Sequence, residues 1–114
     1  MKESELQTKI KERLTKHGWL VVKLISTNWN GIPDLLCMRK GVAMMLEVKT
    51  ENGVVAPLQE HRIKTLNAIG IHSRVVRSLE DIIEQYLFNN ISLNKLYTFS
   101  VRMFLRSRTL VRDS

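Results

Sequence analysis

Three side chains capable of phosphate or metal chemistry lie close together in an otherwise apolar part of the chain. Asp34 directly follows Pro33, and Glu47 and Lys49 stand on either side of Val48 at the end of an apolar run. Because side chains alternate between the two faces of a β-strand, Glu47 and Lys49 would share one face. Charges in such surroundings are costly unless they are paired or coordinate a metal. The pattern therefore indicates either a metal site or a salt bridge between Lys49 and an acid.

A predicted hairpin would bring the two acids together. A polar turn from Arg39 to Gly41 separates two apolar runs, which is typical of adjacent antiparallel strands. Pairing of these strands places Asp34 beside Glu47, with Lys49 next to them. Carboxylate oxygens of this kind suit Mg²⁺ or Mn²⁺, which take one or two carboxylates together with phosphate oxygens and water. We therefore prefer the metal site and keep the salt bridge as the alternative.

Four short motifs in this region resemble a known nuclease family. They are Gly31-Ile32-Pro33-Asp34, Leu46-Glu47-Val48-Lys49, Pro57-Leu58-Gln59 and Val75-Val76-Arg77-Ser78. In this order they resemble the virus-type replication-repair nuclease domain (VRR-NUC), a branch of the PD-(D/E)xK nuclease superfamily. The resemblance covers roughly residues 3–85, and its specific part is the block from residue 31 to residue 59.

This resemblance implies a Mg²⁺- or Mn²⁺-dependent endodeoxyribonuclease, that is, a phosphodiester hydrolase. Asp34, Glu47 and the backbone carbonyl of Val48 would hold one or two metal ions. Lys49 would act either as a base or as a positive charge that stabilises the phosphate in the transition state. The family resemblance thus assigns catalysis to the same residues that the pattern of charges singled out.

Supporting roles follow from the resemblance for a glutamine and a glutamate. A glutamine after Pro-Leu lines the active site in the family, which assigns that role to Gln59. A glutamate of the first helix assists the metal, usually through water; Glu5 is the better match and Glu3 the second. Gln59 could instead be a solvated residue at a helix start, and Glu5 could simply favour the positive end of the helix. Trp29 either stacks on an unpaired base or closes its loop.

The charge balance favours an anionic partner. The chain has 18 Lys and Arg residues against 11 Asp and Glu residues, a net charge of +7, and nucleic acid is the commonest partner of such domains. Isolated domains of the family resemble dimeric Holliday junction resolvases. The resemblance therefore implies a homodimer that cuts branched DNA in repair or recombination. A restriction-like or general DNA endonuclease and a catalytically silent DNA-binding module are the alternatives.

Hydrophobic periodicity predicts the elements that position these residues. They are a helix over residues 4–16 capped by Ser4, a strand over 19–26 buried on both faces, hairpin strands over 35–38 and 42–49, a helix over 57–69, a strand over 71–77 and a last helix after Ser78. The order αβββαβα predicts an α/β fold, a restriction-endonuclease-like mixed β-sheet flanked by helices. We expect a nuclease domain over residues 1–91. A basic C-terminal extension over 92–114 would pack on the domain, join two protomers or contact DNA.

Composition narrows the setting. No apolar run approaches the ~20 residues that a membrane span requires, and the polar N-terminus predicts no secretory signal. Cys37 is the only cysteine, which excludes a disulfide framework and favours the cytoplasm, in a viral, phage or bacterial intracellular setting. The three histidines lie at no ligand spacing, so a zinc site is not expected.

Overall fold

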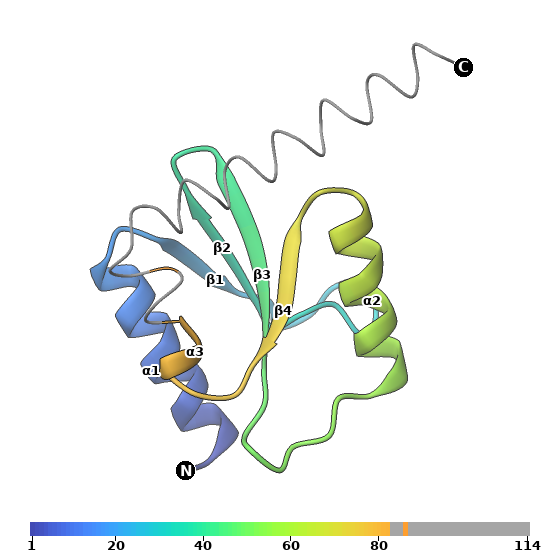
Figure 1. The fold of residues 1–114 in the computed structure, drawn as a ribbon, viewed down its shortest axis with the longest axis horizontal. Helices are drawn as coiled ribbons and strands as arrows, with labels where there is room; N and C mark the ends of the chain where they lie inside the picture. The colour runs from blue at the N-terminus through green and yellow to red at the C-terminus, as the bar shows by residue number, and fades with distance from the viewer. Residues whose placement is uncertain (83–85, 87–114) are drawn as a thin grey trace.

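The computed structural model describes residues 1–82 and residue 86. It contains a mixed sheet with helices against both faces (Figure 1). The elements are α1 (Glu3–Lys16), β1 (Leu20–Lys23), β2 (Leu35–Arg39), β3 (Val42–Val48), α2 (Pro57–Ala68), β4 (His72–Val76) and α3 (Glu80–Ile82). This order confirms the predicted αβββαβα arrangement.

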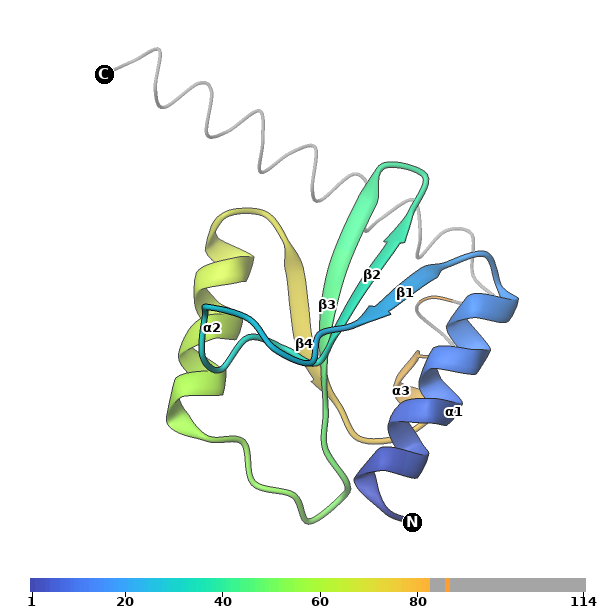
Figure 2. The same cartoon turned by 180° about the vertical axis from the view of Figure 1, so that it is seen from behind.

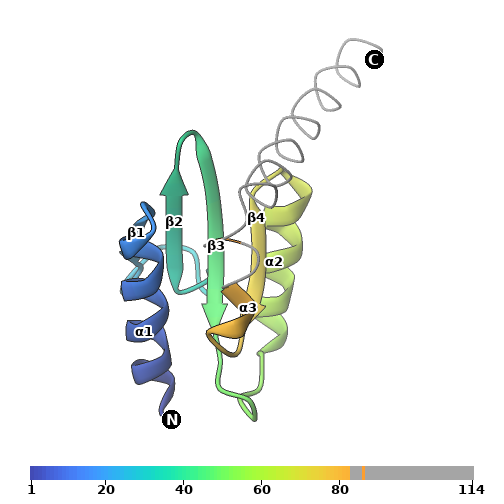
Figure 3. The same ribbon diagram turned by 60° about the vertical axis from the view of Figure 1, so that its left-hand side comes forward.

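The sheet has four strands in the order β1-β2-β3-β4 (Figure 3). The pairs β1–β2 and β2–β3 are antiparallel, and β3–β4 is parallel because α2 carries the chain back across the sheet. In the β2–β3 register Leu35 lies opposite Leu46, so the next positions outward, Asp34 and Glu47, also face one another. The predicted juxtaposition of the two acids is therefore built into the hairpin register.

The tight turn between β2 and β3 sets that register. Lys40 and Gly41 both have positive φ angles, 47° and 80°, as a two-residue hairpin turn requires for strands of right-handed twist. Glycine adopts this conformation without steric cost, and Lys40 pays a modest strain. A slip by one residue would turn Glu47 to the opposite face, so the turn fixes which side of the sheet carries the acid.

Helix α1 begins one residue earlier than predicted. Its N-cap is Lys2, which makes no side-chain cap, and Ser4 lies inside the first turn. The Ser4 carbonyl accepts a hydrogen bond from the Thr8 hydroxyl, at 3.0 Å. The capping-box prediction was therefore wrong, whereas the predicted stop is confirmed by Gly18, with φ of 91°. The shift brings Glu3 into the helix.

Strand β1 is shorter and more exposed than predicted. It spans only Leu20–Lys23 and forms an edge of the sheet, with Val21 buried but Leu20 and Val22 exposed. The expectation of a strand buried on both faces was wrong because an apolar run reads alike in a central and an edge strand. On the side of β1 that faces α1, Val21 is buried and Lys23 is exposed, and the other side is open.

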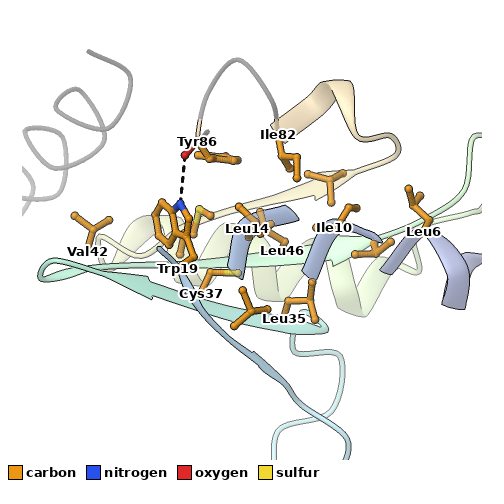
Figure 4. Close-up of a cluster of buried hydrophobic side chains, with 14 residues drawn as sticks. Leu6, Ile10, Leu14, Trp19, Leu35, Cys37, Val42, Leu46, Ile82 and Tyr86 are labelled. Atoms are coloured by element: carbon orange, nitrogen blue, oxygen red, sulfur yellow. Dashed lines mark hydrogen bonds between the residues drawn. The ribbon is translucent and has the colours of Figure 1, made fainter. Parts of the chain in front are cut away.

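The main core lies between the sheet and the pair α1 and α3 (Figure 4). The Trp19 indole N–H donates to the Tyr86 carbonyl at 3.3 Å, and the two rings meet edge to face. Cys37 belongs to this core, and burial raises the pKa of its thiol to about 12. Cys37 is therefore an inert packing residue.

Helix α2 covers the opposite face of the sheet, beside β4. Asn67 exchanges two hydrogen bonds of 2.9 Å with the backbone of Ser73, which holds the end of the helix to the strand. Its apolar side is narrower than the sequence predicted, since Leu66 is buried but Leu58 and Ile69 are exposed. Polar contacts supplement this packing, and those of Gln59 reach the predicted site.

None of the described helices combines the length and the apolar character needed to cross a membrane. The predicted boundary at residue 91 and the basic extension over residues 92–114 lie outside the described residues.

Candidate active site

Asp34 stands where β2 and β3 separate at one end of the sheet. Its Oδ2 accepts a hydrogen bond from the Val48 backbone N–H at 3.1 Å. The backbone pairing of β2 with β3 ends at Leu35 and Leu46, and the Asp34 carboxylate provides one more hydrogen bond beyond it. This bond holds the end of β3 in place. This contact also fixes the Val48 peptide, whose carbonyl is one of the predicted metal ligands.

Glu47 is buried beside Asp34 and is oriented by α2. Its side chain is only 1% exposed, and its Oε1 accepts a hydrogen bond from the Gln59 amide N–H at 2.8 Å. Gln59 Oε1 in turn accepts from the Ala56 backbone N–H at 2.9 Å. A backbone N–H can only donate, so the Gln59 oxygen must face Ala56 and its NH₂ must face Glu47. The start of α2 thus presents a donor of fixed orientation to the acid.

One oxygen of Glu47 has no protein partner. Within the described residues, Oε2 is the buried side-chain oxygen or nitrogen that no hydrogen bond satisfies. Lys49 Nζ lies 3.7 Å from the other oxygen, Oε1, and forms a salt bridge with it. Burial, and next the charge of Asp34, raise the pKa of Glu47 from 4.5 to about 7, while the charge of Lys49 lowers it. The cation offsets only part of the cost of burying this carboxylate.

The N-terminus of α1 adds a further acidic side chain near the pair. The charge of Glu3 also raises the pKa of Glu47, as the smallest of the contributing causes. Both Glu3 and Glu5 are exposed in the first turn of α1, and no contact joins Glu5 to Glu47 within the part of the chain that the structure describes. Electrostatics therefore link Glu3, the second of the two predicted glutamates, to the site.

The loop after Lys49 is held by Arg77, a residue whose role the sequence did not reveal. Its Nη1 donates to the carbonyls of Thr50, Glu51 and Gly53 at 2.7, 3.3 and 2.8 Å. The Lys49 backbone N–H donates to the Val76 carbonyl at 3.0 Å, so the chain on both sides of this point is tied to the end of β4. The Val-Val-Arg-Ser motif singled out Arg77 in the sequence. Its partners lie 24 to 27 residues earlier in the chain, so the motif did not reveal them.

The loop before Asp34 is held by α2. The Arg62 guanidinium lies 4.3 Å from the centre of the Trp29 ring, and its Nε donates to the Asn30 carbonyl at 2.8 Å. Gly31 has φ of 81°, and a Cβ at this position would lie 2.8 Å from Leu58 Cγ. Arg62 therefore fastens this loop, and Trp29 closes it, one of the two roles predicted for that ring.

The predicted residues thus converge on one end of the sheet. Asp34 and Glu47 come from neighbouring strands, Lys49 follows β3, and Gln59 reaches in from α2. Within residues 1–82 and 86, no group of three or more His, Cys, Asp or Glu side chains is arranged to hold a metal ion. The acidic donors at this point are the two strand carboxylates.

Comparison with known proteins agrees with this arrangement. The profile of the VRR-NUC domain matches residues 1–80. The chain belongs to the VRR-NUC family. A solved structure described as a VRR_NUC domain is 35% identical, with a TM-score of 0.66, over 74% of this chain and 96% of that one. Another, described as a VRR_NUC domain protein, shares the fold at 21% identity and a TM-score of 0.61, over 75% of this chain and 88% of that one. No curated protein matches the chain.

Membership in VRR-NUC implies nuclease activity of the PD-(D/E)xK kind. The sequence prediction assigns this chemistry to Asp34, Glu47 and Lys49. The structure brings these three side chains together. The hairpin register places the two acids opposite one another, and the salt bridge places Lys49 against Glu47.

Proposed function

We propose that this chain is a Mg²⁺- or Mn²⁺-dependent endonuclease that hydrolyses phosphodiester bonds in branched DNA, with Holliday junctions as the leading candidate substrate. The observation that supports the metal dependence is the buried carboxylate of Glu47. It lies next to the charge of Asp34, and its Oε2 accepts no hydrogen bond from any described residue. A buried charge of this kind persists when it is paired or coordinates a metal.

The residues present fit a hard divalent cation. Asp34 and Glu47 supply carboxylate oxygens, and the Val48 carbonyl supplies a third oxygen next to them, which is the donor chemistry that Mg²⁺ and Mn²⁺ take in proteins. Glu3 is exposed and acts on Glu47 by charge, so it suits support through water. We infer that Glu3, rather than Glu5, fills the role of the helix glutamate.

The protein side chains divide the remaining tasks. Gln59 holds Glu47 in one orientation, because its fixed NH₂ group donates to Oε1. The other oxygen, Oε2, is thereby left to face the metal. Lys49 supplies a positive charge next to Glu47, where it would stabilise negative charge on the phosphate in the transition state. When bound, the metal would polarise the scissile phosphate and make water a stronger nucleophile near neutral pH.

Family resemblance and charge support the choice of substrate. A net charge of +7 favours a polyanion, and a homodimer would bring two such sites to one branched DNA molecule. Cleavage of matched linear duplex, flap and four-way junction substrates in Mg²⁺ or Mn²⁺ tests this preference. Equal cleavage of all three substrates would leave a general DNA endonuclease, and light scattering of the free protein tests the dimer.

Alanine variants of the strand residues test the assignment of the site. Asp34→Ala and Glu47→Ala should lose both Mn²⁺ binding, measured by titration calorimetry, and cleavage. Lys49→Ala should lose cleavage but keep Mn²⁺ binding, because Lys49 carries no metal ligand. Glu60→Ala, which removes an exposed acid on α2, serves as the control and should keep both. Wild-type cleavage rates in all three site variants would refute the assignment.

A further inference from the structure

Helix α1 lies beside the edge strand β1 (Figure 2), and a groove runs between these two elements. Its volume is about 550 Å³. The wall formed by α1 presents two lysines, Lys11 and Lys16, and the wall formed by β1 presents Lys23. Glu12 is the one acidic residue that lines it. The groove therefore has a net positive charge that comes from two separate elements.

These lysines are not neutralised by the surrounding protein. Within the part of the chain that the structure describes, none of the three forms a salt bridge. Glu12 precedes Lys16 by four residues, a spacing that often gives a helix ion pair, yet the two do not pair here. Like charges on facing walls repel, and a polyanion between them would relieve that repulsion.

The groove ends beside the active site. Lys23 is the last residue of β1 and lies opposite Leu35, which directly follows Asp34. The Leu24 backbone N–H donates to the Asp34 carbonyl at 2.8 Å. Neighbouring strands lie about 5 Å apart, so the backbone of Lys23 is within one strand spacing and one residue of Asp34. Lys23 and Leu35 line the α1 face of the sheet, whereas Glu47 is turned towards Gln59 of α2. A strand of nucleic acid that leaves the groove would therefore pass round the end of β1 and β2 to reach the catalytic acids.

We propose that this groove binds the phosphodiester backbone of one DNA strand on its path to the catalytic acids. The proposal rests on the nuclease function proposed above and adds the surface that guides the substrate. The groove side of α1 runs from Gln7 to Lys16, a rise of about 14 Å. One strand of duplex DNA carries a charge every 3.4 Å along its axis, so about four phosphates span this length. The Thr15 hydroxyl lines the same wall as an additional donor.

A pair of charge-matched double variants tests the proposal. Lys11→Gln with Lys23→Gln removes one lysine from each wall. Lys9→Gln with Lys40→Gln removes the same charge from exposed positions outside the groove, one on α1 and one in the hairpin turn at the far end of β2 and β3. Binding of a fluorescent four-way junction is measured by anisotropy over a range of salt concentrations, in a Glu47→Gln background that prevents cleavage. Cleavage kinetics are measured in the parent background.

The groove variant should bind more weakly, and its slope of log affinity against log salt should fall by about 1.4 to 1.8, because two phosphate contacts are lost. Its KM should rise several-fold while kcat stays within about twofold. The control variant should follow the parent protein. An unchanged salt slope and KM in the groove variant would overturn the proposal while leaving the nuclease function intact. A reduced slope in a protein that cleaves no DNA would support the groove and refute the proposed function.

Discussion

Replacing Glu47 by glutamine should remove a pH-dependent loss of stability from the metal-free protein. Burial and the charge of Asp34 raise the pKa of Glu47 from 4.5 to about 7 in the folded state. The folded protein therefore holds a proton on this side chain more tightly than the unfolded chain does. It follows that the contribution of Glu47 to the free energy of unfolding is greatest below pH 4.5, falls as the pH rises towards 7, and then levels off.

The size of the effect follows from the same values. The window between 4.5 and about 7 spans roughly 2.5 pH units, and each unit corresponds to 1.36 kcal/mol. Ionised Glu47 should therefore cost the metal-free fold about 3 kcal/mol at pH 8. A small domain has only about 5–15 kcal/mol of stability in total, so the loss would be easy to measure.

Urea unfolding in EDTA between pH 4.5 and 8.5 measures this cost. The informative quantity is the difference in free energy of unfolding between wild type and Glu47→Gln, because titrations shared by both proteins cancel. Glu12→Gln provides the matched control at an exposed acid, and its difference from wild type should stay flat with pH. A flat difference for Glu47→Gln as well would show that the buried carboxylate is not strained, and the reasoning about its unpartnered oxygen would fail.

Three further predictions concern metal binding and the supports of the site. Mn²⁺ at 100 times its dissociation constant should stabilise wild type by about 2.7 kcal/mol in thermal unfolding, while Glu47→Gln gains little; equal gains would exclude Glu47 as a ligand. Gln59→Ala leaves Glu47 Oε1 without its amide donor and should lower Mn²⁺ affinity or kcat roughly 10- to 100-fold, with unchanged values contradicting the positioning role. Arg77→Ala frees three carbonyls after Lys49 and should cost about 2 kcal/mol in urea unfolding, whereas Arg13→Ala in the last turn of α1 should cost less; the reverse order would argue against this role of Arg77.

The central hairpin could be predicted from the sequence because its signals are local. Lys40 and Gly41 specify a two-residue turn, and the apolar runs on either side leave one register that keeps both inward faces buried. Once that register is set, Asp34 and Glu47 meet without any further information. The helix-start position of Gln59 is equally local, since Pro57 begins α2 and the first turn carries the amide.

The errors arose where the outcome depends on distant parts of the chain. Whether β1 is central or at an edge depends on which strands pair with it, and an apolar run carries no such information. The first turn of α1 starts at Glu3 without a side-chain cap, so the sequence carried no signal for this start and favoured Ser4 as the cap. The carbonyl contacts of Arg77 depend on the close approach of a loop and a strand end that are more than 20 residues apart.

The charge layout of α1 has an explanation that does not involve DNA, so Lys23 is the decisive residue of the groove. Acids in the first turn of a helix and bases in the last turn are favoured by the helix dipole alone, which accounts for Glu3 and Lys16. Lys23 has a different alternative role, because a charge on an edge strand discourages pairing with other chains. Lys23→Glu separates the two roles. It keeps a charge on the edge, so protection of the edge should persist and the protein should stay dispersed in light scattering. In contact with a phosphate backbone, the reversed charge should weaken junction binding more than Lys23→Gln does, and equal affinity in both variants would assign Lys23 to edge protection.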